Sequence, residues 1–283
     1  MSKMRRPTTG EAAEISLTPD KGWHCSHFFY RFDRVLLAES SEADLSEGAA
    51  EITAILDPES QTAPQRLQTS IVSGHKADFS LMVMDGDPLK VDSVHQSLLA
   101  SRLGSVLVPT YSFVSMTEVS EYVPSLEEFG KLLIEEGEQE GSPAYDAKIK
   151  AYKERDAPMR KQRLMPEFPP WPATCFYPMN KSRIPNANWY TLPKSERSAM
   201  MSDHGRTGMS FAGKVTQVVT VSVGLDDWEW GVTLWARNPE FLKNIVYRMR
   251  YDEVSAKYAE FGPFYTSYVA SAEEMLAHCR VAS

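Results

Sequence analysis

Cysteine is scarce in this sequence, and the few cysteines follow no recognisable spacing. Only three, Cys25, Cys175 and Cys279, occur in 283 residues. An odd number at such distances matches no zinc-ligand motif and argues against a disulfide framework. The sequence therefore predicts a protein of a reducing compartment, which we expect to be the cytoplasm.

Long apolar runs and the common short motifs are also missing. No segment approaches the roughly 18 apolar residues that a membrane helix needs, and the first twenty residues lack the apolar core of a secretory signal. We therefore expect no membrane partner. A Rossmann glycine fingerprint, a Walker loop, a Gly-x-Ser-x-Gly elbow and a His-Glu-x-x-His zinc motif do not occur. These absences exclude the commonest nucleotide-binding, hydrolase and zinc-protease classes.

An overall excess of positive charge is lacking too. The net charge is −8, which disfavours a general nucleic-acid binder. One stretch differs, because residues 177–217 carry six basic side chains against two acidic ones. A local basic island in an acidic chain favours a small anionic ligand, and the alternative is a set of solvated surface cations. The basic side chains are Lys181, Arg183, Lys194, Arg197, Arg206 and Lys214.

The chain repeats one order of predicted elements twice. In the first half, strands are predicted at 23–34, 67–72, 77–84 and 106–119, with helices at 45–56 and 92–103. In the second half, strands are predicted at 174–179, 215–223, 227–235 and 264–269, with helices at 194–206 and 239–250. Asn238 is expected to cap the last of these helices, with Pro239 at its first position.

Each half therefore follows the β-α-β-β-α-β order of the ferredoxin-like arrangement. The predicted fold class is α+β, with two such halves that pack face to face or close into a barrel with helices outside. The boundaries are a flexible tail at 1–20, an N-terminal half at 21–142 and a C-terminal half at 173–283. Between the halves we expect a helical connector at 143–172, which ends in a group of prolines.

The strand at 215–223 contains one polar residue on an otherwise apolar face. Alternation places Gln217 beside Val215, Val219 and Val221. A glutamine that faces inward needs hydrogen-bond partners. It either pairs with a backbone group, which is the commoner case, or faces a polar pocket. The nearby acids Asp226, Asp227 and Glu229 are instead expected to mark a turn and a polar strand face.

Two further side chains could carry redox chemistry. His204 follows Met200 by one helical turn, and a histidine in methionine-rich packing could hold a heme iron, although a lone histidine is more often structural. Tyr177 ends an apolar strand, and a tyrosine can donate a hydrogen bond or be oxidised to a radical. More often such a tyrosine only packs. Lys181, four residues further on, could supply positive charge to a carboxylate.

Several segments of the second half resemble the coproheme decarboxylases of the chlorite dismutase superfamily. The first half matches more loosely, at FFYR (28–31) and GHKAD (74–78). The segments that carry the resemblance lie in the same order as in that family: YPMNK (177–181), NWY (188–190), HG (204–205), GKV (213–215), GLDDWEWGVTL (224–234), MRYDEVSA (249–256) and EFG (260–262).

The resemblance implies a dimeric α+β barrel within one chain, assembled as a homopentamer, with a porphyrin in the second half. It implies oxidative loss of carbon dioxide from two propionates of iron coproporphyrin III (coproheme), which gives two vinyls and heme b. Hydrogen peroxide would be the oxidant, and coproheme would be both substrate and redox cofactor. A ferrochelatase would be the expected transient partner that delivers coproheme.

The resemblance also implies roles for individual residues. Tyr177 corresponds to the tyrosine that forms the radical, Lys181 to a lysine beside the reacting propionates, and His204 to the proximal iron ligand. The remaining positions expected around the porphyrin are Arg163, Met179, Gln217, Trp228 and Ser255, of which Gln217 is the distal glutamine.

Two departures from the family pattern bear on function. Many relatives carry an arginine where this chain has Met209, so that one propionate contact is either absent or supplied by Arg206. Chlorite dismutases carry a distal arginine where this chain has Gln217, which argues against chlorite as substrate. The alternatives are a heme-binding protein without turnover and a heme peroxidase or chlorite-splitting enzyme. Tyr177 and Lys181 favour the decarboxylase, because binding alone needs neither.

Overall fold

The strands form a closed barrel. The structure, a computed structural model, describes residues 15–281, so that residues 1–14 of the expected tail lie outside the described part. Neighbouring strands pair in the order β5-β11-β2-β3-β1-β4-β8-β9, and β9 pairs back with β5. The bounds of these strands are β1 His24–Phe32, β2 Arg66–Val72, β3 Phe79–Asp85, β4 Leu107–Thr117, β5 Ala173–Lys181, β8 Val215–Val221, β9 Trp230–Ala236 and β11 Tyr265–Val269.

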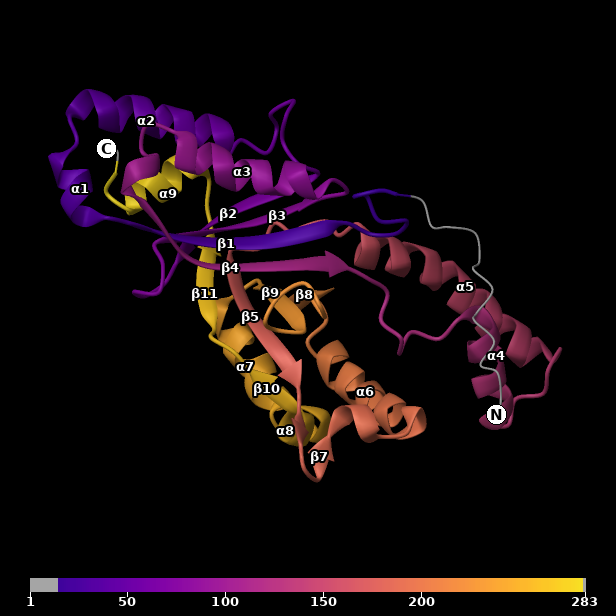
Figure 1. Cartoon of the computed structure of the whole chain (residues 1–283). Helices are drawn as coiled ribbons and strands as arrows, with labels where there is room; N and C mark the ends of the chain where they lie inside the picture. The colour runs from indigo at the N-terminus through magenta and orange to yellow at the C-terminus, as the bar shows by residue number, and fades with distance from the viewer. Residues whose placement is uncertain (1–14, 282–283) are drawn as a thin grey trace, which may run out of the picture.

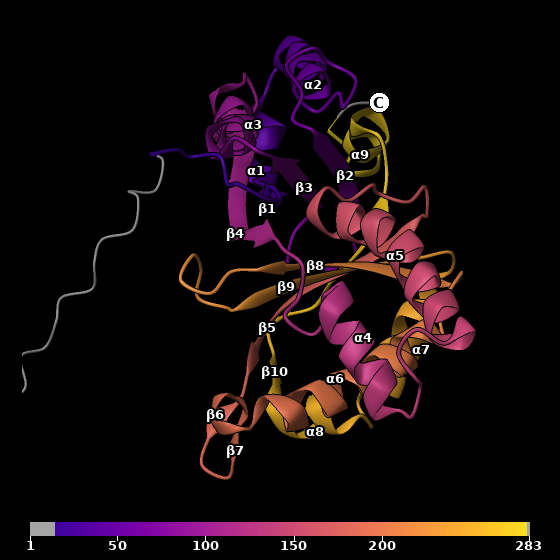
Figure 2. The same ribbon diagram turned by 90° about the vertical axis from the view of Figure 1, so that its right-hand side faces the viewer.

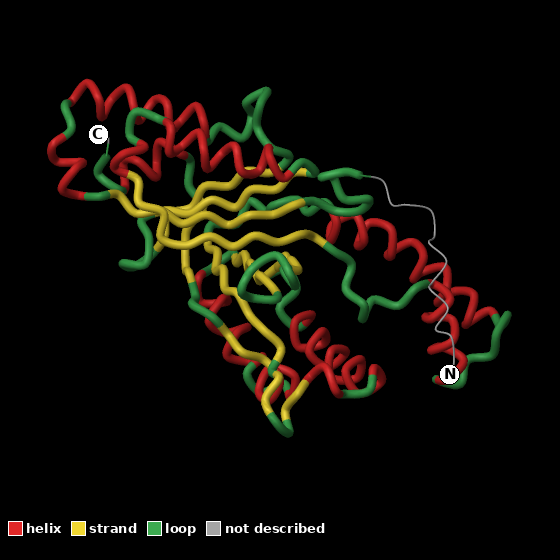
Figure 3. The backbone as a smooth tube through the Cα atoms, in the orientation of Figure 1, coloured by secondary structure: helices red, strands yellow, loops and turns green. Residues whose placement is uncertain are grey.

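Helices lie outside this barrel, and short elements extend it (Figures 1 and 3). A short strand, β10 (Ala259–Phe261), adds to the end of β5, and β6 (Arg183–Ile184) with β7 (Ala187–Asn188) forms a separate hairpin. The helices are α1 Arg34–Glu39, α2 Glu42–Ile55, α3 Pro88–Ala100, α4 Leu126–Glu135, α5 Pro143–Leu164, α6 Lys194–Met209, α7 Pro239–Met249, α8 Glu253–Tyr258 and α9 Ala272–His278. The 3₁₀ turns are η1 Gly104–Val106 and η2 Trp189–Thr191.

Two ferredoxin-like halves make up the barrel, as the order of predicted elements indicated. The first contributes β2-β3-β1-β4 and the second β11-β5-β9-β8, and each set has the crossed strand order of that arrangement. The halves join where β11 pairs with β2 and where β4 pairs with β8. Of the two packings left open by the sequence, the barrel is therefore the one observed.

The predicted helix starts and stops are largely where the structure has them. The side chain of Asn238 accepts a hydrogen bond from the backbone N–H of Glu240 at 2.9 Å, so it caps α7 as expected. The helical connector predicted at 143–172 contains α5, and a further helix, α4, precedes it; the two helices pack on each other beside the barrel (Figure 1). Within the described part, no helix is both long and apolar enough to cross a bilayer.

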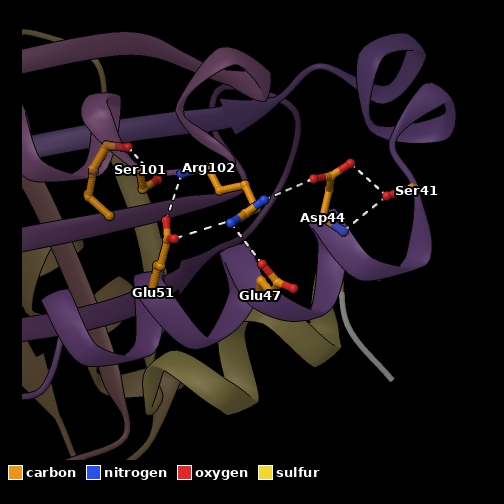
Figure 4. Close-up of polar contacts among 7 residues, drawn as sticks. Ser41, Asp44, Glu47, Glu51, Ser101 and Arg102 are labelled. Atoms are coloured by element: carbon orange, nitrogen blue, oxygen red, sulfur yellow. Dashed lines mark hydrogen bonds and ion pairs between the residues drawn. The ribbon is translucent and has the colours of Figure 1, made fainter.

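The core of the first half lies between its sheet and the helices α2, α3 and α9. The C-terminal helix α9 returns to this half, where Met275 and Leu276 are buried against residues of β1, β3 and α2. A polar cluster lies on the outer side of α2, where the guanidinium of Arg102 is surrounded by three carboxylates of this helix (Figure 4). These are Asp44 at 3.3 Å, Glu47 at 2.8 Å and Glu51 at 3.8 Å.

The second half has two apolar faces with different partners. One face of β5 and β9 points into the barrel, where Phe176 packs with Phe29, Phe113 and Tyr265 of other strands. The opposite face packs against α7. At the C-terminal end of α7 a cavity lies between this helix and the sheet, and it is the candidate site.

Candidate functional site

A cavity of about 570 Å³ lies between the outer face of the second-half sheet and the helices α6, α7 and α8. Its sheet wall comes from β5, β9 and β8. A further wall comes from residues 118–123, here called the strap, which follow β4 and lead to α4 (Figure 2). The C-terminal part of α5 adds Arg163. Both halves and the connector therefore contribute to one cavity.

The sheet wall follows from strand register. Tyr177 of β5 pairs with Val232 of β9, which pairs with Val219 of β8, so these side chains form one row on the same face. Gln217 lies in the next row of that face. Gln217 and Val219 are exposed to the cavity, whereas the residue between them, Val218, is buried on the opposite face. Of the two expectations for Gln217, the structure therefore matches the polar pocket.

Tyr177 is held by aromatic packing at the cavity wall. Its side chain is buried, with its ring centroid 4.5 Å from that of Phe264 and 5.8 Å from that of Phe261. Burial raises the pKa of the Tyr177 phenol, and Cys175 adds to this effect while Arg250 opposes it. The phenol therefore keeps its proton at neutral pH, which leaves a hydrogen atom available for transfer.

His204 faces the cavity from α6 with one ring nitrogen already engaged. Its Nδ1 lies 3.1 Å from Oδ2 of Asp252, whose other oxygen accepts a hydrogen bond from the Thr207 hydroxyl at 3.0 Å. Burial lowers the pKa of His204, against the effect of Asp252 and together with that of Lys181. A neutral imidazole that donates Nδ1–H to a carboxylate presents Nε2 to a metal.

One histidine is a poor site for a free metal ion. In the described residues, no group of three or more His, Cys, Asp or Glu side chains is placed to hold one. A single imidazole suits instead an iron whose other in-plane ligands come from a macrocycle. The donor set of the cavity therefore fits an iron porphyrin.

Three cationic side chains reach the cavity: Arg163, Lys181 and Arg250. Within residues 15–281, none of the three forms an ion pair with a protein carboxylate. Lys181 places its Nζ 4.4 Å from the centroid of Trp189, and burial lowers its pKa to about 8, against the effect of Glu229. Cations without protein partners beside an apolar wall suit a ligand that brings its own carboxylates.

Seven of the eight predicted site residues line this one cavity: Arg163, Tyr177, Met179, Lys181, His204, Gln217 and Ser255. Trp228 does not. It lines a separate surface pocket with Tyr111, Ser112, Asp226 and Asp227, and its indole packs close to Gly262.

The arginine question raised by Met209 has a structural answer. Met209 is 74% exposed, and Arg206 pairs with Asp203, and neither lines the cavity. Arg250 lines it instead, with its guanidinium 3.9 Å from the centroid of Phe261. Of the two alternatives, a contact supplied by Arg206 is therefore the one that the cavity lining does not support. Arg250 was within reach of the sequence, since it stands in the MRYDEVSA segment that carried the resemblance.

Other residues of the site were not predicted from the sequence, because they are brought together only by the tertiary structure. Asp252 is 48 positions from His204, so no local spacing connects them. Glu118 and Glu121 belong to the strap, which comes from the other half. Glu229 was assigned to a polar strand face, but it is buried and accepts hydrogen bonds from the Lys181 backbone and from Arg183. It thereby holds the end of β5 that carries Lys181.

Comparisons with known sequences give consistent results. Residues 46–270 match the profile of the family described as chlorite dismutase. The chain is 36% identical over 265 residues to the coproheme decarboxylase of Staphylococcus carnosus, covering 92% of this chain and 96% of that protein. It is 34% identical over 273 residues to the coproheme decarboxylase of Oceanobacillus iheyensis, covering 95% of this chain and 100% of that protein.

Comparisons with solved structures agree on the fold. A heme-binding protein from Thermus thermophilus superposes with a TM-score of 0.75 at 31% identity, covering 92% of this chain and 96% of that one. A mutant chlorite dismutase from Candidatus Nitrospira defluvii superposes with a TM-score of 0.69 at 16% identity, covering 92% and 97%. At that identity the second likeness concerns the fold alone.

Proposed function

This chain belongs to the chlorite dismutase family, and from that membership we infer that it is a coproheme decarboxylase, an enzyme of heme biosynthesis. The observation that carries the inference is the pairing of His204 with Asp252 in a cavity that also contains Tyr177 and Lys181. Two relatives with that name match nearly the whole chain at 34% and 36% identity.

We propose that coproheme occupies the cavity with its iron at Nε2 of His204. Arg163, Lys181 and Arg250, together with the hydroxyl of Ser255, would take the propionates. Val219 and Val232 would contact the ring, since they form the apolar centre of the sheet wall. Trp228 lies outside the cavity, so we assign it no direct contact. When bound, the iron porphyrin supplies the redox chemistry that couples peroxide to its own side chains.

Each decarboxylation is a two-electron oxidation. The propionate –CH₂–CH₂–COO⁻ becomes –CH=CH₂ and carbon dioxide, and it releases two electrons and one proton. Hydrogen peroxide takes up two electrons and two protons and gives two waters. One turnover therefore consumes one peroxide and one further proton, and conversion of coproheme to heme b consumes two peroxides.

Tyr177 is the residue we propose for the hydrogen-atom step. Its phenol is neutral because burial raises its pKa, so it can give up a hydrogen atom and then recover one from the propionate carbon next to the ring. Lys181 follows four residues later on the same strand, β5. Below a pH of about 8 it is a cation that can hold the reacting carboxylate beside Tyr177.

Further parts of the proposal rest on the family resemblance. We propose hydrogen peroxide as oxidant, a homopentamer, a cytoplasmic location and a transient contact with a ferrochelatase that delivers coproheme. Gln217 disfavours a chlorite-splitting activity, because a neutral amide cannot hold a chlorine oxyanion as an arginine would. A heme-binding protein without turnover is the alternative that the decisive experiment must separate.

The test is a peroxide titration of the purified protein loaded with coproheme, followed by mass spectrometry of the porphyrin. Two successive losses, each of one carbon dioxide and two hydrogens, are expected in the wild type. Tyr177→Phe is expected to bind coproheme normally and to lose at least about 100-fold in decarboxylation rate. Tyr247→Phe is the matched control, since Tyr247 is exposed and lies outside the cavity. Tight binding with no mass change in the wild type would leave a heme-binding protein as the better account.

A further inference from the structure

The cavity contains a carboxylate that neither the relatives nor the family resemblance assigns to a role. We propose that Glu118 of the strap is the acid–base residue of the cavity, which takes a proton from hydrogen peroxide and returns it to the departing oxygen. The inference rests on the proposed function, since it concerns the peroxide that this function consumes.

Strand register places Glu118 beside the reacting region. Met116 pairs with Val221 and Thr117 with Thr220, and the registered pairing ends there. Extended by one residue, the same register would set Glu118 opposite Val219. Directly opposed residues of antiparallel strands point to the same face. Val219 faces the cavity, and Glu118 lines it as well. On the extended register, Glu118 would continue the row of Tyr177, Val232 and Val219 at the cavity wall.

Glu118 is also a neighbour of Gln217. Gln217 precedes Val219 by two residues on the same strand and face, so the extended register would place it diagonally across from Glu118, and diagonal neighbours are typically about 7–8 Å apart. Both residues line the cavity. Two side chains that reach toward each other from that distance can contact one small molecule. Gln217 can donate and accept hydrogen bonds to peroxide, but an amide does not take up a proton. A carboxylate beside it can.

Within residues 15–281, no protein group occupies the carboxylate of Glu118. In the described part of the chain it forms no ion pair and no side-chain hydrogen bond, whereas Glu121, three residues later, lies 3.7 Å from Arg197. Partial desolvation, and then the charge of Glu121, raise the pKa of Glu118 above its ordinary value. A general base works best when its pKa approaches the working pH.

The other titratable groups of the cavity are unsuited to accept this proton. The guanidinium side chains of Arg163 and Arg250 offer hydrogen-bond donors only, and Lys181 is protonated below a pH of about 8. The phenols of Tyr122, Tyr177 and Tyr190 have raised pKa values, so they hold their own protons. His204 directs Nδ1 to Asp252 and Nε2 to the iron position. Glu118 remains.

The proton balance is simple. Glu118–COO⁻ and HOOH give Glu118–COOH and HOO⁻, with no change in oxidation state. When the O–O bond breaks, the same proton goes to the leaving oxygen, and the carboxylate is restored. The residue acts on peroxide alone, and the proton that the overall reaction consumes comes from solvent.

Cyanide tests the proposal without turnover. Hydrogen cyanide must lose one proton before it binds ferric iron, so it makes the same demand on a base as peroxide does. Stopped-flow mixing of coproheme-loaded protein with cyanide near pH 7 gives the association rate constant. Glu118→Gln is expected to lower it by about 10–100-fold. Glu127→Gln is the matched control, because it makes the same charge change at an exposed position of α4 outside the cavity, and it is expected to stay within about twofold of the wild type.

Two further measurements distinguish a loss of acid–base chemistry from a change in the access of ligands to the iron. Imidazole binds as a neutral ligand, so its association rate is expected to be equal in Glu118→Gln and wild type. The cyanide difference is expected to disappear at alkaline pH, where the ligand is already an anion. Equal cyanide rates in Glu118→Gln and wild type, or an equal slowing of imidazole, would overturn the proposal. So would a fall in coproheme affinity as large as the fall in cyanide rate, because it would assign Glu118 to seating the ring.

The proposed function and this inference fail differently. If the wild type does not bind or decarboxylate coproheme, the proposed function is wrong. If it does both, and cyanide association is unchanged by Glu118→Gln, only the role of Glu118 is wrong.

Discussion

At the scale of single residues, desolvation sets the charge of the site. Burial raises the pKa of Tyr177 and lowers those of His204 and Lys181. In each case the charged form is disfavoured in the free protein. A phenol that keeps its hydrogen and an imidazole free for a metal are both useful to a heme enzyme. Lys181 differs, because within the described residues no protein carboxylate pairs with its ammonium group. Its expected partner is a carboxylate of the ligand.

Replacement of Lys181 is expected to change stability in a pH-dependent way. The folded pKa of about 8 lies below the unfolded value, so the unfolded chain binds more protons between about pH 8 and 10.5, and stability rises with pH there. Below pH 8 the buried cation therefore costs on the order of 3 kcal/mol. Lys181→Met is expected to be more stable than wild type at pH 7, to lack the rise above pH 8, and to bind coproheme more weakly.

Urea unfolding of the apoprotein at several pH values measures this difference. Lys194→Met is the control, because Lys194 is 60% exposed and does not line the cavity. The interpretation would be wrong if the two variants showed the same pH dependence.

At the scale of helices and strands, the sequence predicted what local chemistry determines. Asn238 before Pro239 identified the start of α7, and alternation in β8 put Gln217 and Val219 on one face. Local patterns could not connect His204 with Asp252, since α6 and α8 meet only in the folded chain. Nor could they bring Glu118 into one cavity with Tyr177, because Glu118 follows β4 in the first half and Tyr177 lies on β5 in the second.

A close approach of two segments behind Tyr177 is expected to be sensitive to one methyl group. The backbone N–H of Gly262 donates to the carbonyl of Pro178 at 2.9 Å. A Cβ at Gly262 would lie 2.7 Å from Cγ of Pro178 and 2.9 Å from the Trp228 ring, both of which are rigid. Gly262→Ala is therefore expected to destabilise the protein by about 1–3 kcal/mol. It is also expected to slow decarboxylation, because Pro178 follows Tyr177 directly.

Thermal unfolding and the peroxide titration together check this expectation. Gly86→Ala is a suitable comparison, since its added Cβ would meet Thr18 at 3.5 Å and Trp23 at 3.8 Å, which are ordinary contacts. If both glycine variants behaved like the wild type, the contact behind Tyr177 would not constrain the site.

At the scale of the whole molecule, the repeated order of elements predicted two halves but left their packing open. The barrel closes at two seams, of which β11–β2 has three registered pairs and β4–β8 has two. No sequence pattern marks such short pairings. The second seam leads directly into the strap, so the closure of the barrel brings the first half to the cavity. That contribution is the part of the site that cannot be predicted from either half alone.

Coproheme is therefore expected to order both sides of the molecule at once. Its iron would tie α6 through His204, while its ring and carboxylates would contact the sheet wall, Arg250 and the strap. Hydrogen exchange is expected to slow in residues 118–123 and in the part of α6 around His204, and ligand at 100 times its Kd is expected to stabilise the fold by about 2.7 kcal/mol.

Iron-free coproporphyrin III separates the two contributions. It carries the same four carboxylates without the metal, so it is expected to slow exchange in the strap and to leave α6 close to its free rate. Protection of α6 alone by coproheme would mean that the strap does not close on the ligand in solution, and the site would then belong to the second half only. Equal protection of α6 by both ligands would mean that His204 does not bind the iron. Because the strap and α6 report separately through their hydrogen-exchange rates, one exchange experiment tests the shared cavity and its metal ligand independently.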